Sequence, residues 1–253
     1  MVQKSALYYF SPTGGTRRVG SAFAAAAAQS VRELDLGARD QTPEAPACDL
    51  AVFALPVFGG RIPAPAAEKL RSLHGSGTKA VTLVVYGNRA YDDALLELNH
   101  TVAAAGFEIL ASGAFIARHS IVPQVAAGRP DDADLKEIRD FAEKVLKKIA
   151  GGDSSTPAVP GNDPYKPEMQ VAAAPISLEN CRHCGKCAAV CPTGAIRVSE
   201  TEVITELSNC ILCMACTSVC PEKARVLPEA LQSGMNQKLM PLKEIRRENE
   251  IFI

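Results

Sequence analysis

Residues 181–192 read CRHCGKCAAVCP, and residues 210–221 read CILCMACTSVCP. Both stretches follow the pattern C-x2-C-x2-C-x3-C-P, and a shift of 29 residues carries the first onto the second. The two-residue gaps let three thiolates of one short loop converge on one inorganic centre. The fourth cysteine lies one residue further along, where it is available to a second centre. Because eight of the nine cysteines lie in this repeat, the repeat decides the structure of the last third of the chain.

The repeat resembles the ligand frame of bacterial ferredoxins that carry two 4Fe–4S clusters. This resemblance implies that each cluster takes three cysteines from one stretch and the fourth from the other. The first cluster would be held by Cys181, Cys184, Cys187 and Cys220, and the second by Cys210, Cys213, Cys216 and Cys191. Zinc sites and disulfide frameworks are the alternatives for clustered cysteines. Zinc usually takes two short cysteine pairs, and disulfide frameworks belong to exported small domains, so we interpret the repeat as an iron–sulfur motif.

The composition excludes several classes of protein. The chain has 253 residues and a net charge of −1, which allows one medium and one small domain and gives no field that would recruit nucleic acid. No apolar run approaches the ~18 residues that span a bilayer, and the strand-like start leaves no room for a signal peptide. We therefore expect a cytoplasmic protein without a membrane span or a nucleic-acid partner. The ninth cysteine, Cys48, is expected to be a buried or loop thiol.

Apolar runs alternate with helical patterns through the first 150 residues. Strands are expected near 4–10, 31–36, 49–56, 79–86 and 107–118, and helices near 16–29, 64–73, 91–105 and 131–150. The last helix begins acidic and ends basic, as the helix dipole favours. Such alternation predicts the α/β class, with a doubly wound five-stranded parallel sheet and helices on both faces. Ligands of such sheets bind beyond the carboxyl ends of the strands.

A turn rich in hydroxyl groups and glycine follows the first strand. It reads SPTGGT at residues 11–16 and leads into the first helix. Backbone N–H groups at a helix N-terminus, together with hydroxyl groups, can bind a phosphate, and a purely structural turn is the alternative. Neither the Walker A pattern nor the dinucleotide-binding G-x-G-x-x-G pattern is present.

Two more loops follow the third and fourth strands, with PVFGGR at 56–61 and YGNRAYDD at 86–93. With the first turn they resemble the phosphate loop and the two isoalloxazine-binding loops of flavodoxins, which implies FMN. The residues so implied are Ser11, Thr13, Gly14, Gly15, Thr16, Pro56, Val57, Phe58, Gly59, Gly60, Tyr86, Gly87, Asn88, Arg89, Tyr91 and Asp92. Phe58 and Tyr91 either border the flavin ring or pack between loop and sheet. Arg89 either bonds the polar edge of the ring or forms a surface salt bridge.

The chain therefore divides into four expected segments. These are a flavodoxin-like FMN-binding domain at 1–150, a proline-rich linker at 151–175, a small α+β two-cluster ferredoxin-like domain at 176–228 and a C-terminal tail at 229–253. Five prolines make the linker extended and semi-stiff. Its PYKP at 164–167 either docks on a domain surface or forms an exposed turn. The mixed charges of the tail are typical of a solvated helix or a docked tail.

Taken whole, the sequence resembles a flavodoxin fused to a two-cluster ferredoxin. The resemblance implies electron relay between FMN and the clusters, which couples one-electron to two-electron steps for redox partner proteins. The alternative is an oxidoreductase whose flavin reduces a small acceptor, such as a quinone, a corrinoid or a metal complex, with electrons from a ferredoxin-type donor. No acid–base or nucleophilic motif stands out, and both a monomer and a homodimer remain open.

Overall fold

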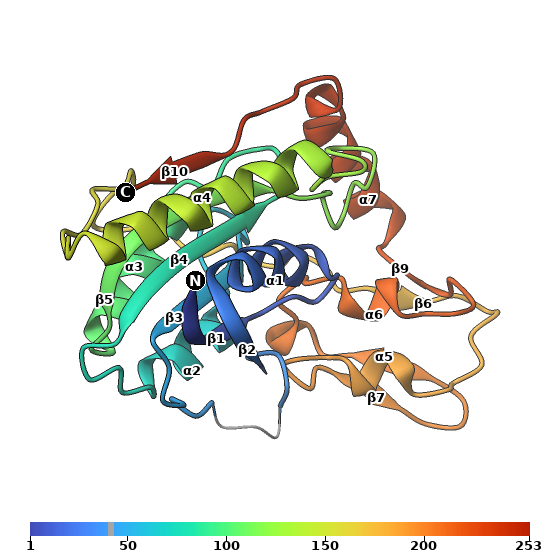
Figure 1. Ribbon diagram of the computed structural model, residues 1–253. Helices are drawn as coiled ribbons and strands as arrows, with labels where there is room; N and C mark the ends of the chain where they lie inside the picture. The colour runs from blue at the N-terminus through green and yellow to red at the C-terminus, as the bar shows by residue number, and fades with distance from the viewer. Residues whose placement is uncertain (40–42) are drawn as a thin grey trace.

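A six-stranded sheet organises the larger part of the molecule (Figure 1). We describe residues 1–39 and 43–253 of a computed structural model. The strands are β1 (Val2–Tyr9), β2 (Ala28–Asp35), β3 (Leu50–Pro56), β4 (Lys79–Tyr86), β5 (Glu108–Ile116) and β10 (Glu250–Phe252). Their spatial order is β2-β1-β3-β4-β5-β10, and the first five are parallel. An order of 2-1-3-4-5 is that of the flavodoxin-like doubly wound fold, so the predicted fold class is confirmed.

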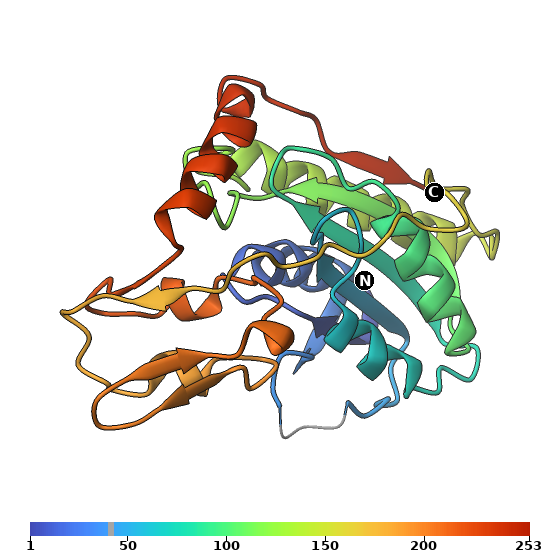
Figure 2. The same ribbon diagram turned by 180° about the vertical axis from the view of Figure 1, so that it is seen from behind.

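Helices cover both faces of the sheet (Figures 1 and 2). They are α1 (Gly15–Ala27) and α4 (Asp132–Ala150) on one face, and α2 (Ala64–Arg71) and α3 (Ala94–Ala104) on the other. Successive strand residues alternate between the two apolar cores, since Leu7 packs with α1 and α4 and Tyr8 packs with α2 and α3. Every residue of the central strand β3 is buried, as a continuous apolar run in a parallel sheet requires.

The C-terminal tail returns to the sheet. Helix α7 (Glu229–Leu239) leads through the short 3₁₀ helix η2 (Met240–Leu242) to β10, which pairs antiparallel with β5. The pairing sets Glu250 opposite Ala114 and Phe252 opposite Ser112. The sequence analysis predicts five strands and does not predict this sixth one. Because β10 covers one outer edge, it removes a row of unpaired backbone groups from solvent.

The proline-rich segment 151–175 lies against the α/β part. Of the two alternatives for residues 164–167, a docked segment and an exposed turn, the structure shows the docked segment. The Lys166 carbonyl accepts from Arg61 at 2.7 Å, and the Lys166 N–H donates to Asp93 at 2.7 Å. The Tyr165 hydroxyl lies 2.6 Å from Nδ1 of His100. Figure 2 shows the segment crossing the molecule in front of the sheet. The linker is thus extended but anchored.

The cysteine-rich unit is built from short elements. Its two small antiparallel sheets pair β6 (Ile176–Ser177) with β9 (Arg225–Val226) and β7 (Ile196–Val198) with β8 (Val203–Thr205). Its helical elements are α5 (Lys186–Ala189), α6 (Ala215–Ser218) and the 3₁₀ helix η1 (Leu207–Asn209). In the described part of the chain, no helix is both long enough and apolar enough to cross a membrane.

Candidate functional site

The eight cysteines of the repeat fall into two sets, each around its own small cavity. One cavity is lined by Cys181, Cys184, Cys187 and Cys220, and the other by Cys191, Cys210, Cys213 and Cys216. Each set combines three cysteines of one loop with the fourth cysteine of the other stretch. The structure thus brings together the groups that an exchange of ligands between the two stretches requires.

The duplication in sequence is also a duplication of backbone conformation. Three pairs of residues, 29 positions apart, have positive φ angles. They are His183 (51°) with Leu212 (54°), Gly185 (75°) with Met214 (64°), and Gly194 (67°) with Lys223 (51°). Positive φ is uncommon for residues other than glycine, so its recurrence at equivalent positions shows that both cysteine loops hold the same turn. These turns aim the three thiols of each loop into one cavity.

Burial makes several of these thiols hard to ionise. It raises the pKa of Cys213 to about 12 and also raises the pKa values of Cys187, Cys210 and Cys216. A buried thiolate needs a nearby positive charge, and iron supplies one when it binds the sulfur. The two sets of four cysteines, in which Cys187, Cys191 and Cys216 are buried and Cys184 is exposed, therefore fit the ligand requirement of two 4Fe–4S clusters.

The three loops of the α/β part meet at the carboxyl edge of the sheet, where they border a cleft. A cavity of about 70 Å³ is lined by Pro12, Thr13, Gly15, Thr16, Pro56, Val57, Phe58, Val85, Tyr86, Gly87, Ala117, Arg118, His119, Ser120 and Cys213. A second cavity of about 540 Å³ shares Thr13, Gly15 and residues 118–120, and adds Gly14 and Arg18. The structure thus brings residues of all three predicted FMN loops to one place.

The first loop provides the features of a phosphate site. Gly14 has a φ of 88° and Gly15 begins helix α1, whose first N–H groups have no acceptor within the helix. A Cβ atom on Gly15 would lie 3.0 Å from that of Ala117, so the chain passes closely here. Ser11 Oγ accepts from the N–H of Arg17 at 2.9 Å and thereby holds the turn. The guanidinium-bearing residues Arg18 and Arg118 line the adjoining cavity, and they add positive charge that the sequence analysis does not predict.

Other predicted residues of the second and third loops make different contacts. Among the described residues, Gly59, Gly60, Asn88, Arg89, Tyr91 and Asp92 do not line either of these two cavities. The Tyr91 hydroxyl donates to Glu250 at 2.8 Å, and its ring packs on Tyr86 with centroids 5.5 Å apart. Arg89 forms an ion pair with Asp92. For Tyr91 and Arg89 the structure therefore shows packing and a salt bridge, and direct contact with FMN stays a prediction for all six.

A comparison with known protein families bears on the cysteine-rich part of this description. Residues 180–224 match the family model of the 4Fe-4S dicluster domain. The chain joins a flavodoxin-like fold to a 4Fe–4S dicluster domain.

Solved flavodoxins are similar to the flavodoxin-like part. A flavodoxin of Streptococcus pneumonia TIGR4 is 16% identical over 57% of this chain and 99% of its own, with a TM-score of 0.42. A flavodoxin from the domain Archaea is 13% identical over 58% of this chain and 99% of its own, with a TM-score of 0.43. Flavodoxin 1 from Bacillus cereus is 16% identical over 57% and 98%, with a TM-score of 0.43. No curated protein matches the chain. The fold assignment therefore rests on the strand order.

The dicluster domain forms one side of the flavodoxin-like cleft. Cys213 lines the small cavity together with Val57 and Gly87, and Thr217 and Ser218 of α6 line the larger one. Ile211 and Phe58 both pack against the apolar core on the α2 and α3 side of the sheet. One residue of the second cysteine set, Cys213, thus lies beside the loops predicted for the flavin ring. Spacing within the sequence gives no signal for this contact.

The end of β5 is a part of the cleft that the sequence analysis missed. The N–H groups of Ile121 and Val122 donate to His119 Nδ1 at 3.1 and 3.2 Å. A Cβ atom on Gly87 would lie 2.4 Å from the His119 ring, so glycine is required for this packing. Burial, with a smaller contribution from the charge of Arg89, lowers the pKa of His119 to about 4. His119 is therefore neutral at the cleft at pH 7. The position of His119 just after the fifth parallel strand could have indicated its place at the cleft, because that strand ends at the same edge of the sheet.

This neutral histidine predicts a pH-dependent stability. Between pH 6.5 and 4 the unfolded chain takes up a proton at His119 that the folded chain does not, so stability falls as the pH falls. We expect His119→Asn to remove roughly 2 kcal/mol of the loss between pH 7 and pH 4.5, because each pH unit between 6.5 and 4.5 is worth about 1.4 kcal/mol. Urea unfolding at pH 7 and pH 4.5 measures the effect, with His74→Asn at an exposed position as control. Equal pH profiles for His119→Asn and wild type would contradict it.

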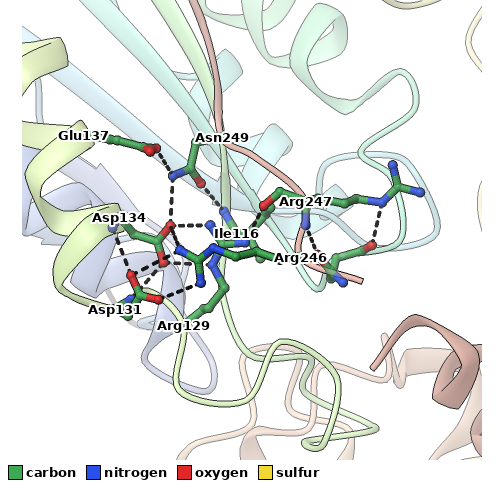
Figure 3. A network of polar contacts seen from close by, with 9 residues as sticks. Ile116, Arg129, Asp131, Asp134, Glu137, Arg246, Arg247 and Asn249 are labelled. Carbon is green, nitrogen blue, oxygen red and sulfur yellow. Dashed lines mark hydrogen bonds and ion pairs between the residues drawn. The ribbon is translucent and has the colours of Figure 1, made fainter. Parts of the chain in front are cut away.

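A polar network fastens the C-terminal tail beside the cleft (Figure 3). Arg129 and Asp134 form an ion pair whose side chains are 5% and 2% exposed. Asn249 donates to Asp134 at 3.0 Å and accepts from the N–H of Ile116 at 3.0 Å. Arg247 Nε donates to the Asn88 carbonyl at 3.0 Å. The tail therefore holds the third cleft loop and the start of α4 in a fixed relation.

Proposed function

We propose that this protein relays electrons between FMN in the flavodoxin-like cleft and two 4Fe–4S clusters in the dicluster domain. The observation that carries the proposal is the cavity in which Cys213 meets Val57, Gly87 and the first turn of α1. A cluster held by Cys213 would stand next to the flavin ring. The first cysteine set, which includes the exposed Cys184, would then exchange electrons with partner proteins.

The proposal divides the chain into segments with separate tasks. Residues 1–150 bind FMN, the proline-rich linker at 151–175 joins the two parts, and residues 176–228 hold both clusters. The tail at 229–253 supports the cleft through Asn88. FMN supplies exchange of one or two electrons, whereas each cluster carries one, so two cluster electrons match one two-electron step at the flavin.

The residues at the cleft would serve different parts of FMN. The N–H groups of the first turn of α1, with Thr13 and Thr16, would hold the terminal phosphate. Val57, Phe58, Tyr86 and Gly87 would border the ring, and the neutral His119 would pack behind Gly87. Arg18 and Arg118 would offset the phosphate charge from the wider cavity.

The phosphate assignment predicts a loss of FMN affinity. Thr13→Ala and Thr16→Ala are each expected to weaken binding by roughly 1.5–3 kcal/mol, the usual value of a hydrogen bond to a charged group. Fluorescence titration of the FMN-free protein with FMN, and in parallel with FAD, measures the change. Thr201→Ala, at an exposed turn of the dicluster domain, is the matched control. Unchanged FMN affinity in the double variant, or tight retention of FAD, would overturn this phosphate site.

The cluster assignment predicts the metal content. Protein purified without oxygen should contain about eight irons and eight acid-labile sulfides per chain, as two cubanes require. Iron and sulfide analysis together with metal analysis for zinc measures this. A preparation with stoichiometric zinc and no labile sulfide would show that the cysteines serve another metal.

A further inference from the structure

Arg225 is a buried cation inside the dicluster domain. The residue is 3% exposed and begins strand β9. The 29-residue repeat places Ile196 at the equivalent position, where it is 7% exposed and begins strand β7. The second half of the repeat therefore carries a charge where the first half carries an aliphatic side chain. A buried charge is costly unless something compensates it.

Neutral oxygen atoms accept hydrogen bonds from both terminal nitrogens of the Arg225 guanidinium. Nη1 donates to Ser177 Oγ at 3.0 Å, and Nη2 donates to the Pro175 carbonyl at 2.8 Å and to Thr205 Oγ1 at 2.5 Å. Within residues 1–39 and 43–253, no carboxylate forms a salt bridge with Arg225. Its buried Nε–H has no acceptor among the described residues. The described residues thus supply no carboxylate partner for Arg225 and no acceptor for its Nε–H, although its side chain also interacts with the Cys216 thiol.

Both cysteine cavities lie beside this cation. Arg225 lines the cavity of the first set with Cys187. Pro175 and Thr205, which accept hydrogen bonds from its Nη2, line the cavity of the second set. Four thiolates outweigh the positive charge of a cubane core, so a loaded cluster is an anion. The two clusters would provide the missing counter-charge and sulfur acceptors for Nε–H.

We propose that Arg225 is the shared internal counter-charge of both clusters and holds their reduction potentials higher than the cysteines alone would set them. The inference rests on the proposed function, because it requires clusters at both cysteine sets. When a cluster accepts one electron from a donor such as dithionite, its negative charge grows by one. A fixed cation beside it stabilises the reduced form more than the oxidised form. In a buried site, salt screens this effect only weakly.

Redox titration of the full-length, cluster-loaded protein with dithionite, followed by electron paramagnetic resonance, tests the proposal. Arg225→Ile, which copies Ile196, is expected to make both clusters harder to reduce, by at least tenfold in the one-electron equilibrium constant, or about 59 mV. In Arg225→Lys, both reduction potentials should lie closer to those of the wild type than to those of Arg225→Ile. Arg197→Leu removes a cation whose side chain is 71% exposed, and it should change the potentials by less than a third as much. These differences should persist in 0.5 M salt.

Iron and sulfide content separates the possible failures. If wild-type protein lacks clusters, the proposed function is wrong; if it is loaded and Arg225→Ile leaves both potentials unchanged, only the role of Arg225 is wrong. A merely structural brace would lower the melting temperature without moving the potentials of loaded protein. If Arg225→Ile fails to load, the neutral Arg225→Gln is compared with Arg225→Lys. Lower potentials in the glutamine variant support the proposal, and equal potentials overturn it.

Discussion

Cys191→Ala is expected to destroy or convert the cluster held by Cys210, Cys213 and Cys216, although Cys191 belongs to the other stretch of the repeat. The reason is that Cys191 lines the cavity of these three residues. A cubane that loses one of four thiolates becomes a three-iron cluster or falls apart. Iron content should therefore fall from about eight per chain to about seven if the cluster is converted, or to about four if it is lost. The remaining four-iron resonance signal should belong to the first set.

The matched control is Cys48→Ala, because Cys48 lies outside both sets and is half-buried beside the apolar core. It should leave the iron and sulfide contents unchanged. If Cys191→Ala instead altered the cluster of Cys181, Cys184 and Cys187 alone, the ligands would not be exchanged between the stretches. The cysteines that line one cavity in the structure would then not be the ligands of one cluster.

Arg129→Met is expected to lower the free energy of unfolding of the flavodoxin-like part by about 3–5 kcal/mol. The substitution removes the Arg129 guanidinium from the buried Asp134 carboxylate and leaves it the more distant and half-exposed Arg246, at 3.7 Å. Breaking a buried pair on one side typically costs that much. Urea unfolding followed by far-ultraviolet circular dichroism measures the effect. Lys136→Met breaks an exposed pair with Asp140, whose side chains are 71% and 48% exposed, and should cost only about 0–1 kcal/mol.

A double variant tests whether the loss comes from the unpaired Asp134 charge. Replacing both partners, as in Arg129→Met with Asp134→Leu, removes the uncompensated charge and should recover part of the loss. The recovery is only partial, because Asp134 also accepts from Asn249 and from the N–H of Asp131. A loss below 1 kcal/mol in Arg129→Met would show that the network of Figure 3 is not an anchor for the tail.

The repetitive and periodic parts of this protein could be predicted from sequence. All five strands and four helices expected in the first 150 residues are present. They could be predicted because the residues that each element buries recur with the period of a strand or a helix within its own short sequence. Helix α3 begins at Ala94 instead of near residue 91. Positive φ angles at Asn88 and Asp92 belong to the turn before it.

The contacts between distant segments could not be predicted in the same way. Strand β10 has three residues, too few for a periodic pattern, and its pairing depends on the docking of α7 and the tail. The tail engages Asn88 and Tyr91, so loop residues that resemble flavin neighbours also hold the tail. The contact of Cys213 with the cleft likewise depends on how two separate units pack. Arg225 could have been singled out, because aligning the repeat with itself sets it against Ile196.

The relay itself is tested most directly by rapid mixing of the loaded protein with a one-electron donor. A linker of about 25 residues could reach ~85 Å if fully extended, yet here it is anchored through Tyr165 and Lys166, and Cys213 lines the cleft. We expect cluster reduction followed by flavin reduction, with a second-phase rate that does not change with protein concentration. A second phase whose rate rises linearly with concentration, or FMN that is never reduced through the clusters, would contradict the account.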